Sequence, residues 1–166
     1  MTHTTQSSIW AGVLALILIV AAGTAHAEAD GAQCSQVGGL IMTNFAVIDA
    51  NTTLGSATGD LRGGVSATIL SITGPQNALT FLVQHHWVTD SGDTIFFGEV
   101  KAFALQVLDS PVYGVTFEPL RITGGTGRFE GARGVLHTFG SADLGSGRTA
   151  FRYTGTVCLS KQANQD

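Results

Sequence analysis

ITGGTGRFEGARG, residues 122–134, is the most distinctive segment of this sequence. Its glycines resemble a dinucleotide-binding loop, but such a loop must open a helix inside a βαβ unit. Residues 135–139, which follow, are strand-like, so we reject a nucleotide-binding loop. The segment instead predicts a tight turn and then a strand that starts at Arg128. The turn glycines, which tolerate positive φ, are Gly124, Gly125 and Gly127.

Outward from this turn, the chain consists of expected strands separated by glycine-containing turns. Runs rich in β-branched and aromatic residues alternate with turn residues about every 12–15 positions, and helix signals are nearly absent. Sequential strands joined by short turns prefer antiparallel neighbours. Gly98 is expected to mark a bulge or a barrel corner inside one of the runs. The expected strands span residues 40–49, 61–72, 78–89, 94–107, 112–123, 128–141 and 148–158.

Several of these strands carry apolar side chains on both faces. Phe81 and Trp87 lie on one face of their strand, and Leu82 and Val88 lie on the other. A closed barrel explains this pattern and removes the sheet edges that no helix is available to cover. The predicted fold is therefore all-β, an eight-stranded antiparallel β-barrel. Along the chain we expect an N-terminal segment at residues 28–39, the barrel at 40–158 and a polar tail at 159–166.

The segment 122–134 resembles the signature turn of the allene oxide cyclase and dirigent β-barrel superfamily. The strand at 92–98 (GDTIFFG) and the late strand that ends at Cys158 are similar as well, so the resemblance covers residues 40–158. Only the segment 122–134 is specific. The resemblance implies an eight-stranded antiparallel barrel with an apolar cavity, often trimeric, of the kind found in small secreted bacterial members.

Characterised plant members of this superfamily guide cyclisation or radical coupling of small hydrophobic molecules. They do so without a bound metal or organic cofactor, so the resemblance implies no cofactor and no metal here. No catalytic residue carries over, because the cyclases use an N-terminal loop with Pro and Glu, and the prolines of this chain are at 75, 111 and 119. A match at a structural turn transfers the fold and not the chemistry.

Residues 1–27 have the features of a secretory signal. An apolar run covers residues 9–22, which is short for a membrane-spanning helix of about 20 residues. The small–x–small pattern of Ala25, His26 and Ala27 follows it, so we expect a signal helix that is cleaved after Ala27. Residues 1–8 contain no Lys or Arg, and the alternative is an uncleaved anchor. The mature protein is expected to be secreted or periplasmic, with no stable membrane anchor.

The two cysteines, Cys34 and Cys158, lie near the two ends of the mature chain. In an exported protein an isolated pair is most simply a disulfide. A metal site or a reactive thiol is the alternative, but there is no CxxC and no His beside either cysteine. A disulfide here would join the chain ends, which suits a barrel whose first and last strands are neighbours.

Composition and charge exclude several classes of protein. Charged residues make up 12% of the chain and the formal net charge is -4, which argues against a nucleic-acid-binding protein. An apolar fraction of 44% with nine Phe argues against disorder. The sequence contains no Gly-x-Ser-x-Gly, HExxH, P-loop or EF-hand motif, so a hydrolase or metalloenzyme lacks support.

His85 and His86 are the most notable polar pair. Adjacent strand residues point to opposite faces, so the pair cannot form one metal site by itself. One imidazole could face the lumen and bind a ligand or act as a general base. The alternative is one interior histidine with satisfied hydrogen bonds and one surface histidine.

Glu99 and Tyr113 are the other polar candidates. An inward Glu99 would have a raised pKa and could act as a general acid, whereas an outward Glu99 would pair with Lys101. Tyr113 is expected to face the lumen with its ring and its hydroxyl. The aromatic residues expected to contact a ligand are Phe81, Trp87, Phe103 and Phe117.

Three functions remain open at this point. The leading hypothesis is a binding protein whose lumen holds a hydrophobic small molecule. The alternative is a cofactor-free cyclase or isomerase that uses His85 or His86, Glu99 and Tyr113 as its catalytic groups. The third is a structural barrel with a filled lumen and no ligand.

Overall fold

A computed structural model describes residues 32–45 and 48–160 of the chain. The expected secretory signal, residues 1–27, and most of the polar tail lie outside the described residues. In the described part of the chain, no helix has the length and apolarity needed to cross a membrane.

The described chain consists of strands and two single-turn 3-10 helices. Each strand corresponds to a run of alternating or β-branched residues, and glycine-containing turns join most of them. The elements are β1 Gln33–Phe45, β2 Thr52–Ala57, η1 Gly59–Leu61, β3 Gly63–Thr73, β4 Ala78–Thr89, β5 Thr94–Phe97, β6 Val100–Gln106, β7 Val112–Phe117, β8 Leu120–Gly125, η2 Gly127–Phe129, β9 Arg133–Asp143 and β10 Arg148–Leu159.

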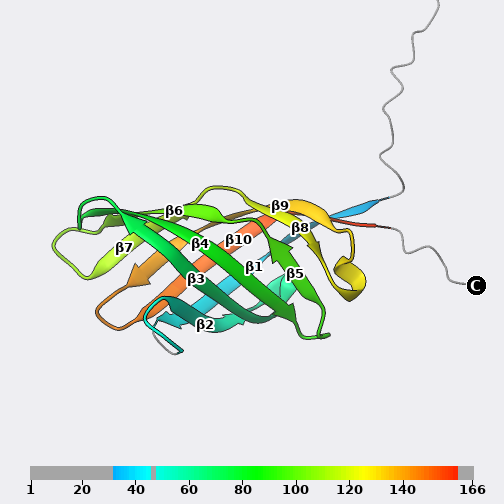
Figure 1. Ribbon diagram of the computed structural model, residues 1–166, viewed down its shortest axis with the longest axis horizontal. Helices are drawn as coiled ribbons and strands as arrows, with labels where there is room; N and C mark the ends of the chain where they lie inside the picture. The colour runs from blue at the N-terminus through cyan, green and yellow to red at the C-terminus, as the bar shows by residue number, and fades with distance from the viewer. Residues whose placement is uncertain (1–31, 46–47, 161–166) are drawn as a thin grey trace, which may run out of the picture.

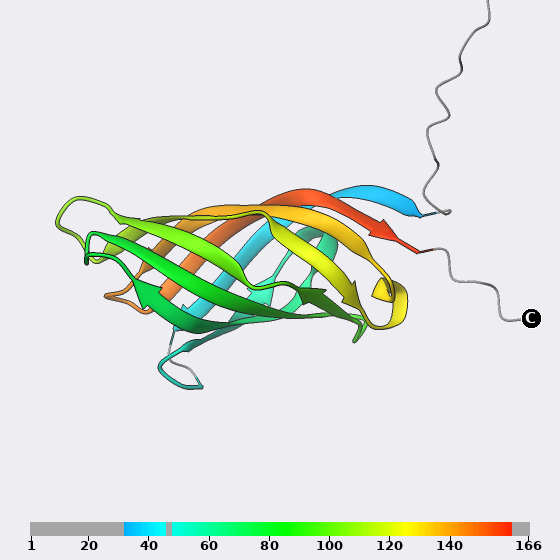
Figure 2. The same cartoon turned by 45° about the horizontal axis from the view of Figure 1, so that its top comes forward.

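These ten strands close into an eight-stranded antiparallel barrel, because two of the eight barrel positions are each occupied by two successive segments (Figures 1 and 2). The predicted fold is therefore confirmed. β5 and β6 are successive parts of one position beside β4. β8 and β7 together fill another position beside β9. The breaks fall at Gly98 and Glu99 in the first case and at Glu118 and Pro119 in the second. The corner expected at Gly98 is therefore confirmed.

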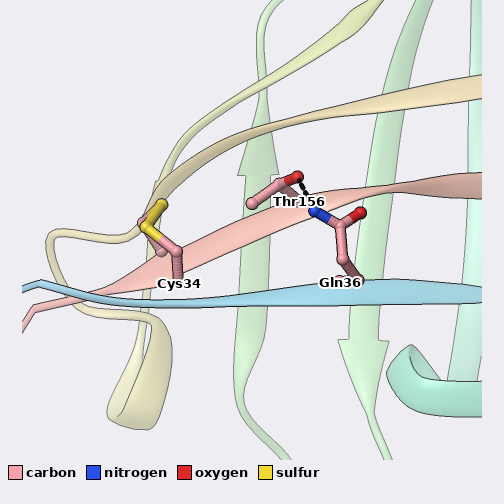
Figure 3. Close-up of a disulfide and its surroundings, with 4 residues drawn as sticks. Cys34, Gln36 and Thr156 are labelled. Atoms are coloured by element: carbon pink, nitrogen blue, oxygen red, sulfur yellow. Dashed lines mark hydrogen bonds between the residues drawn. A yellow bond between two sulfur atoms is a disulfide. The ribbon is translucent and has the colours of Figure 1, made fainter.

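The barrel closes where β1 pairs with β10. Cys34 lies directly opposite Cys158 in this ladder, and the two form the predicted disulfide (Figure 3). Gln36 Nε2 donates a hydrogen bond to Thr156 Oγ1 at 2.8 Å nearby. β1 begins at Gln33, earlier than the expected Leu40, because pairing with β10 extends the strand. Residues 33–36 are exposed, so their sequence has no apolar alternation to mark a strand.

The glycine segment 122–134 forms a turn later than expected, because Gly124 and Gly125 are the last residues of β8 and only Gly127 lies in the turn, and no strand starts at Arg128. Gly124 and Gly127 have φ of 147° and 55°, which favours glycine. After them the chain makes η2, whose Phe129 is buried, and β9 starts only at Arg133. Burial of the Phe129 ring accounts for the extra turn.

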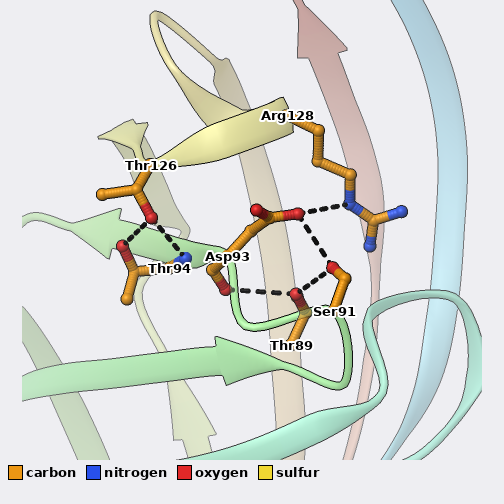
Figure 4. Close-up of polar contacts among 6 residues, drawn as sticks. All are labelled: Thr89, Ser91, Asp93, Thr94, Thr126 and Arg128. Carbon is orange, nitrogen blue, oxygen red and sulfur yellow. Dashed lines mark hydrogen bonds and ion pairs between the residues drawn. The ribbon is translucent and has the colours of Figure 1, made fainter.

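Asp93 links this turn to the β4–β5 hairpin (Figure 4). Its carboxylate accepts a hydrogen bond from Ser91 Oγ at 2.8 Å and lies 3.7 Å from Arg128 Nε. A Cβ on Gly127 would collide with Asp93 Oδ1. Gly127 is therefore required both by its φ and by the approach of this carboxylate.

Candidate functional site

Strand alternation lines the inside of the barrel with apolar side chains around a narrow cavity. The volume of this cavity is about 80 Å³. In the described part of the chain, no Asp, Glu, Lys or Arg lines the cavity. Representative wall residues from six strands are Ile41, Val65, Val83, Ala104, Val115 and Phe151.

One end of the barrel is closed by a floor of buried side chains from η1, β4 and β10. Trp87 Nε1 donates a hydrogen bond to the carbonyl oxygen of Leu61 at 2.7 Å. The Leu61 amide donates to the Tyr153 hydroxyl at 3.0 Å, and that hydroxyl donates to the Thr58 carbonyl at 2.9 Å. Leu61, Trp87 and Tyr153 are at most 3% exposed.

Aromatic contacts complete this floor. The Trp87 ring lies edge-on to the Tyr153 ring at 5.3 Å between centroids, and it is tilted against Phe97 at 5.9 Å. Burial raises the pKa of Tyr153, which keeps its hydroxyl protonated and able to donate. The floor is thus held by both packing and hydrogen bonds.

The other end of the cavity reaches the surface beside the hairpin loops. Phe45, Ile69 and Leu144 line the cavity at this end, and Leu144 is 46% exposed. Ile48 and Leu108 in the neighbouring loops are also exposed. Exposed apolar residues therefore flank the approach to the cavity, together with polar residues of the same loops such as Asp49, Asn77 and Asp109.

His85 is the lumen histidine, and it lies one inward position above Trp87. Its ring makes edge contacts with Phe117 and Phe97, at 5.5 and 6.3 Å between centroids. Desolvation by these surroundings lowers the pKa of His85 to about 4, and His86 adds to the effect. The imidazole is therefore neutral at pH 7. Its Nδ1 has no hydrogen-bond partner.

Four threonines add polar atoms to the lumen: Thr43, Thr53, Thr138 and Thr149. Thr43 and Thr149 share a hydrogen bond of 2.7 Å between their hydroxyls. Thr138 Oγ1 is buried and has no partner. The sequence analysis missed Thr138, although its even-numbered alternation with Leu136 on β9 places it on the inner face.

The structure separates the predicted site residues into two groups. Phe81, Trp87 and Phe117 line the cavity as expected, and so does Tyr113, whose hydroxyl donates to the Gln76 carbonyl at 2.8 Å. The predicted residues on the outside of the barrel are His86, Glu99 and Phe103, all of them exposed.

The inward position expected for Phe103 was wrong, and Glu99 follows its outward alternative, for one reason. Phe97 on β5 faces inward, but after the two-residue break Val100, Ala102 and Ala104 face inward instead. The break therefore reverses which residues point into the lumen. Phe103 is 44% exposed, and Glu99 lies within the break itself. It forms no ion pair with Lys101 in the described part of the chain.

No group of three or more His, Cys, Asp or Glu side chains close enough to hold a metal ion occurs in residues 32–45 and 48–160.

Comparisons with known proteins give one related fold. No family model and no curated protein matches the chain. Among solved structures, the chain is similar to the pterocarpan synthase dirigent protein GePTS1, at 14% sequence identity and a TM-score of 0.47. The match covers 78% of this chain and 92% of that one. This similarity assigns no role to any residue here.

Proposed function

We propose that this protein binds a small apolar molecule in the lumen of its barrel. The observation that carries the proposal is the cavity itself. It is closed by the aromatic floor, it reaches the surface at the loop end, and its walls are apolar. Sites for small molecules have this composition, with a few polar groups that fix the orientation of the ligand. The volume of about 80 Å³ is below the usual ~300–1,000 Å³ of such sites and restricts the occupant to a molecule as small as a single ring.

Removal of apolar surface from water would supply the affinity. Each buried methylene contributes ~0.8 kcal/mol, so a six-carbon ring gains about 5 kcal/mol before the cost of association. Small inward residues leave the necessary space, because Ala67, Ala102 and Ala104 line the cavity where larger side chains would fill it.

Trp87 fluorescence tests this proposal. Of the two tryptophans in the chain, Trp10 lies in the expected signal, so Trp87 on the floor of the cavity is the only one left after cleavage. Trp10→Phe makes Trp87 the only tryptophan emitter in uncleaved protein as well. Titration with cyclohexane is expected to change the Trp87 emission in a saturable way. A structural barrel without a binding site would give no saturable change.

A matched pair of substitutions locates the binding site. Ala104→Leu fills the lumen, so cyclohexane affinity is expected to fall about tenfold or more. Ala150→Leu adds the same atoms to the exposed outer wall and is expected to leave the affinity unchanged. Equal affinities in the two variants would place the ligand outside the lumen.

A cofactor-free isomerase or cyclase is the second candidate, and the neutral His85 in the lumen is the observation that favours it. A neutral imidazole can accept a proton from a bound substrate. Catalysis would depend on His85, because His86 and Glu99 lie on the outside of the barrel. The Tyr113 hydroxyl already donates its hydrogen bond to the Gln76 carbonyl. Molecules that co-purify with the protein would be identified by native mass spectrometry and tested for conversion. Conversion that His85→Phe abolishes while binding persists would favour the enzyme over the binding protein.

We propose in addition that the protein is exported. The Cys34–Cys158 disulfide is compatible with an oxidising compartment. Amino-terminal sequencing of the exported protein is expected to start at Glu28. A sequence that starts at the first residues of the chain would contradict cleavage after Ala27.

A further inference from the structure

The cavity contains two polar atoms that the protein leaves without partners. His85 Nδ1 and Thr138 Oγ1 are the buried side-chain atoms that lack a hydrogen bond in the described part of the chain. Both residues line the same cavity. Buried polar atoms are almost always satisfied in native proteins, so two such atoms in one cavity require an explanation.

One aromatic residue, Phe117, is a neighbour of both His85 and Thr138. The His85 ring contacts Phe117 at 5.5 Å between centroids. Thr116 pairs with Phe139, so the antiparallel register sets Phe117 of β7 beside Thr138 of β9 on the inner face. His85 on β4 and Thr138 on β9 thus line the same cavity as neighbours of Phe117, from different strands.

We propose that His85 Nδ1 and Thr138 Oγ1 form a polar subsite that receives an uncharged hydroxyl or carbonyl group of the lumen ligand. This inference rests on the proposed binding function, and it adds the chemical class of the ligand. The ligand is then an apolar body with one neutral hydrogen-bonding group directed toward Phe117.

The chemistry of the two side chains sets this class. The pKa of His85 is lowered by burial, so the imidazole is neutral and either accepts or donates at Nδ1 according to its tautomer. The Thr138 hydroxyl can also do both. A hydroxyl or a carbonyl oxygen therefore finds a partner at this position.

Charged ligand groups are disfavoured at the same position. In residues 32–45 and 48–160, no ionised side chain lines the cavity to pair with a carboxylate or an ammonium group. Burial of an unpaired charge is far more costly than burial of a hydroxyl. A lone water is a poorer occupant than a ligand, because it would find only the minimum of two polar partners here and would bury no apolar surface.

The test uses four probes of one shape: cyclohexane, cyclohexanol, cyclohexanone and cyclohexanecarboxylate. Their affinities are measured by Trp87 fluorescence in Trp10→Phe protein, with Thr138→Val and His85→Phe added in turn. Thr138→Val preserves the side-chain shape and removes the hydroxyl. Thr116→Val on the exposed outer face is the matched control.

Cyclohexanol and cyclohexanone are expected to lose about threefold to tenfold in affinity in each lumen variant, as for one lost hydrogen bond. Cyclohexane affinity is expected to change by less than about twofold, and Thr116→Val to change nothing. The carboxylate is expected to bind more weakly than the alcohol at pH 7. If His85→Phe does not fold, Thr138→Val carries the comparison alone.

The imidazole also gives a direct signal. The ¹⁵N chemical shift of His85 Nδ1 is expected to move with cyclohexanol and to stay in place with cyclohexane. Equal losses for alcohol and alkane, or no loss for either, would overturn the polar subsite and leave lumen binding intact. If none of the four probes binds protein whose lumen residues are unchanged, both the proposed function and the polar subsite are overturned.

Discussion

His85 gives the barrel a specific dependence on pH. Its pKa is lowered from 6.5 to about 4 in the folded protein, chiefly by burial. The unfolded chain therefore binds more protons than the folded one between these values. Folding is unaffected by His85 above pH 6.5, and stability is lost as the pH falls toward 4.

We expect His85→Phe to remove this loss. Between pH 7 and pH 4, wild-type protein should lose about 2 to 3 kcal/mol of unfolding free energy more than His85→Phe does. Urea unfolding at a series of pH values measures the difference. His137→Gln, on the exposed outer face, serves as the control and should keep the wild-type slope. Parallel slopes for wild type and His85→Phe would show that the imidazole is not buried.

Gly127 is expected to tolerate no side chain. Gly127→Ala meets both an unfavourable φ of 55° and the Asp93 carboxylate. Gly92→Ala, at φ 87° with open space around it, meets only the first. We expect the control to cost about 1 kcal/mol and Gly127→Ala to cost at least about 2 kcal/mol. Equal costs in thermal unfolding would argue against the contact with Asp93.

Single residues were predictable from the sequence where the strand was uninterrupted. Phe81 and Trp87 could be placed by alternation because β4 contains no break. The assignment of His85 rather than His86 to the lumen needed the face of that strand to be known. Phe103 was misplaced because a two-residue break reverses the inward positions and has no fixed sequence signature.

Among the elements, the β1–β10 seam depends on the disulfide. The bond closes a loop between residues separated by 124 positions. In the chain-entropy model such a cross-link stabilises by up to about 5 kcal/mol. Reduction is expected to lower the unfolding free energy by an amount of this order, while Cys34→Ser is expected to be insensitive to the reductant. Unchanged urea midpoints after reduction would contradict this role.

The elements themselves were largely predictable. Turn residues and β-branched runs marked most of the strands that the structure contains. The start of β1 at Gln33 was not predictable, because its pairing with β10 is long-range and its side chains are exposed. η2 was missed for a related reason, since burial of Phe129 is a tertiary effect.

The whole molecule has two dissimilar ends. The floor end carries the Arg62–Asp90 and Arg128–Asp93 ion pairs at 3.6 and 3.7 Å. The other end exposes apolar loop residues, with Leu108 88% exposed. An apolar ligand would therefore meet exposed apolar side chains on the side where the cavity reaches the surface, beside the polar residues of the same loops.

The outer wall bears on the oligomeric state, for which the family resemblance led us to expect a trimer. Leu40, Phe103 and Phe139 are exposed on β1, β6 and β9. We expect sedimentation equilibrium to show self-association that Phe139→Arg weakens by about tenfold or more, because apolar contact area is replaced by charge. A monomer at all concentrations would contradict the prediction.

Methyl NMR titration with cyclohexanol tests lumen binding most directly. Methyl groups of Val65, Val83 and Val115 face the cavity, whereas those of Leu40, Met42 and Leu54 face outward. Our account predicts saturable shifts of the cavity methyls together, with the outer methyls unchanged. Shifts confined to the outer methyls, or no shift up to the solubility limit of the probe, would contradict a ligand-binding lumen.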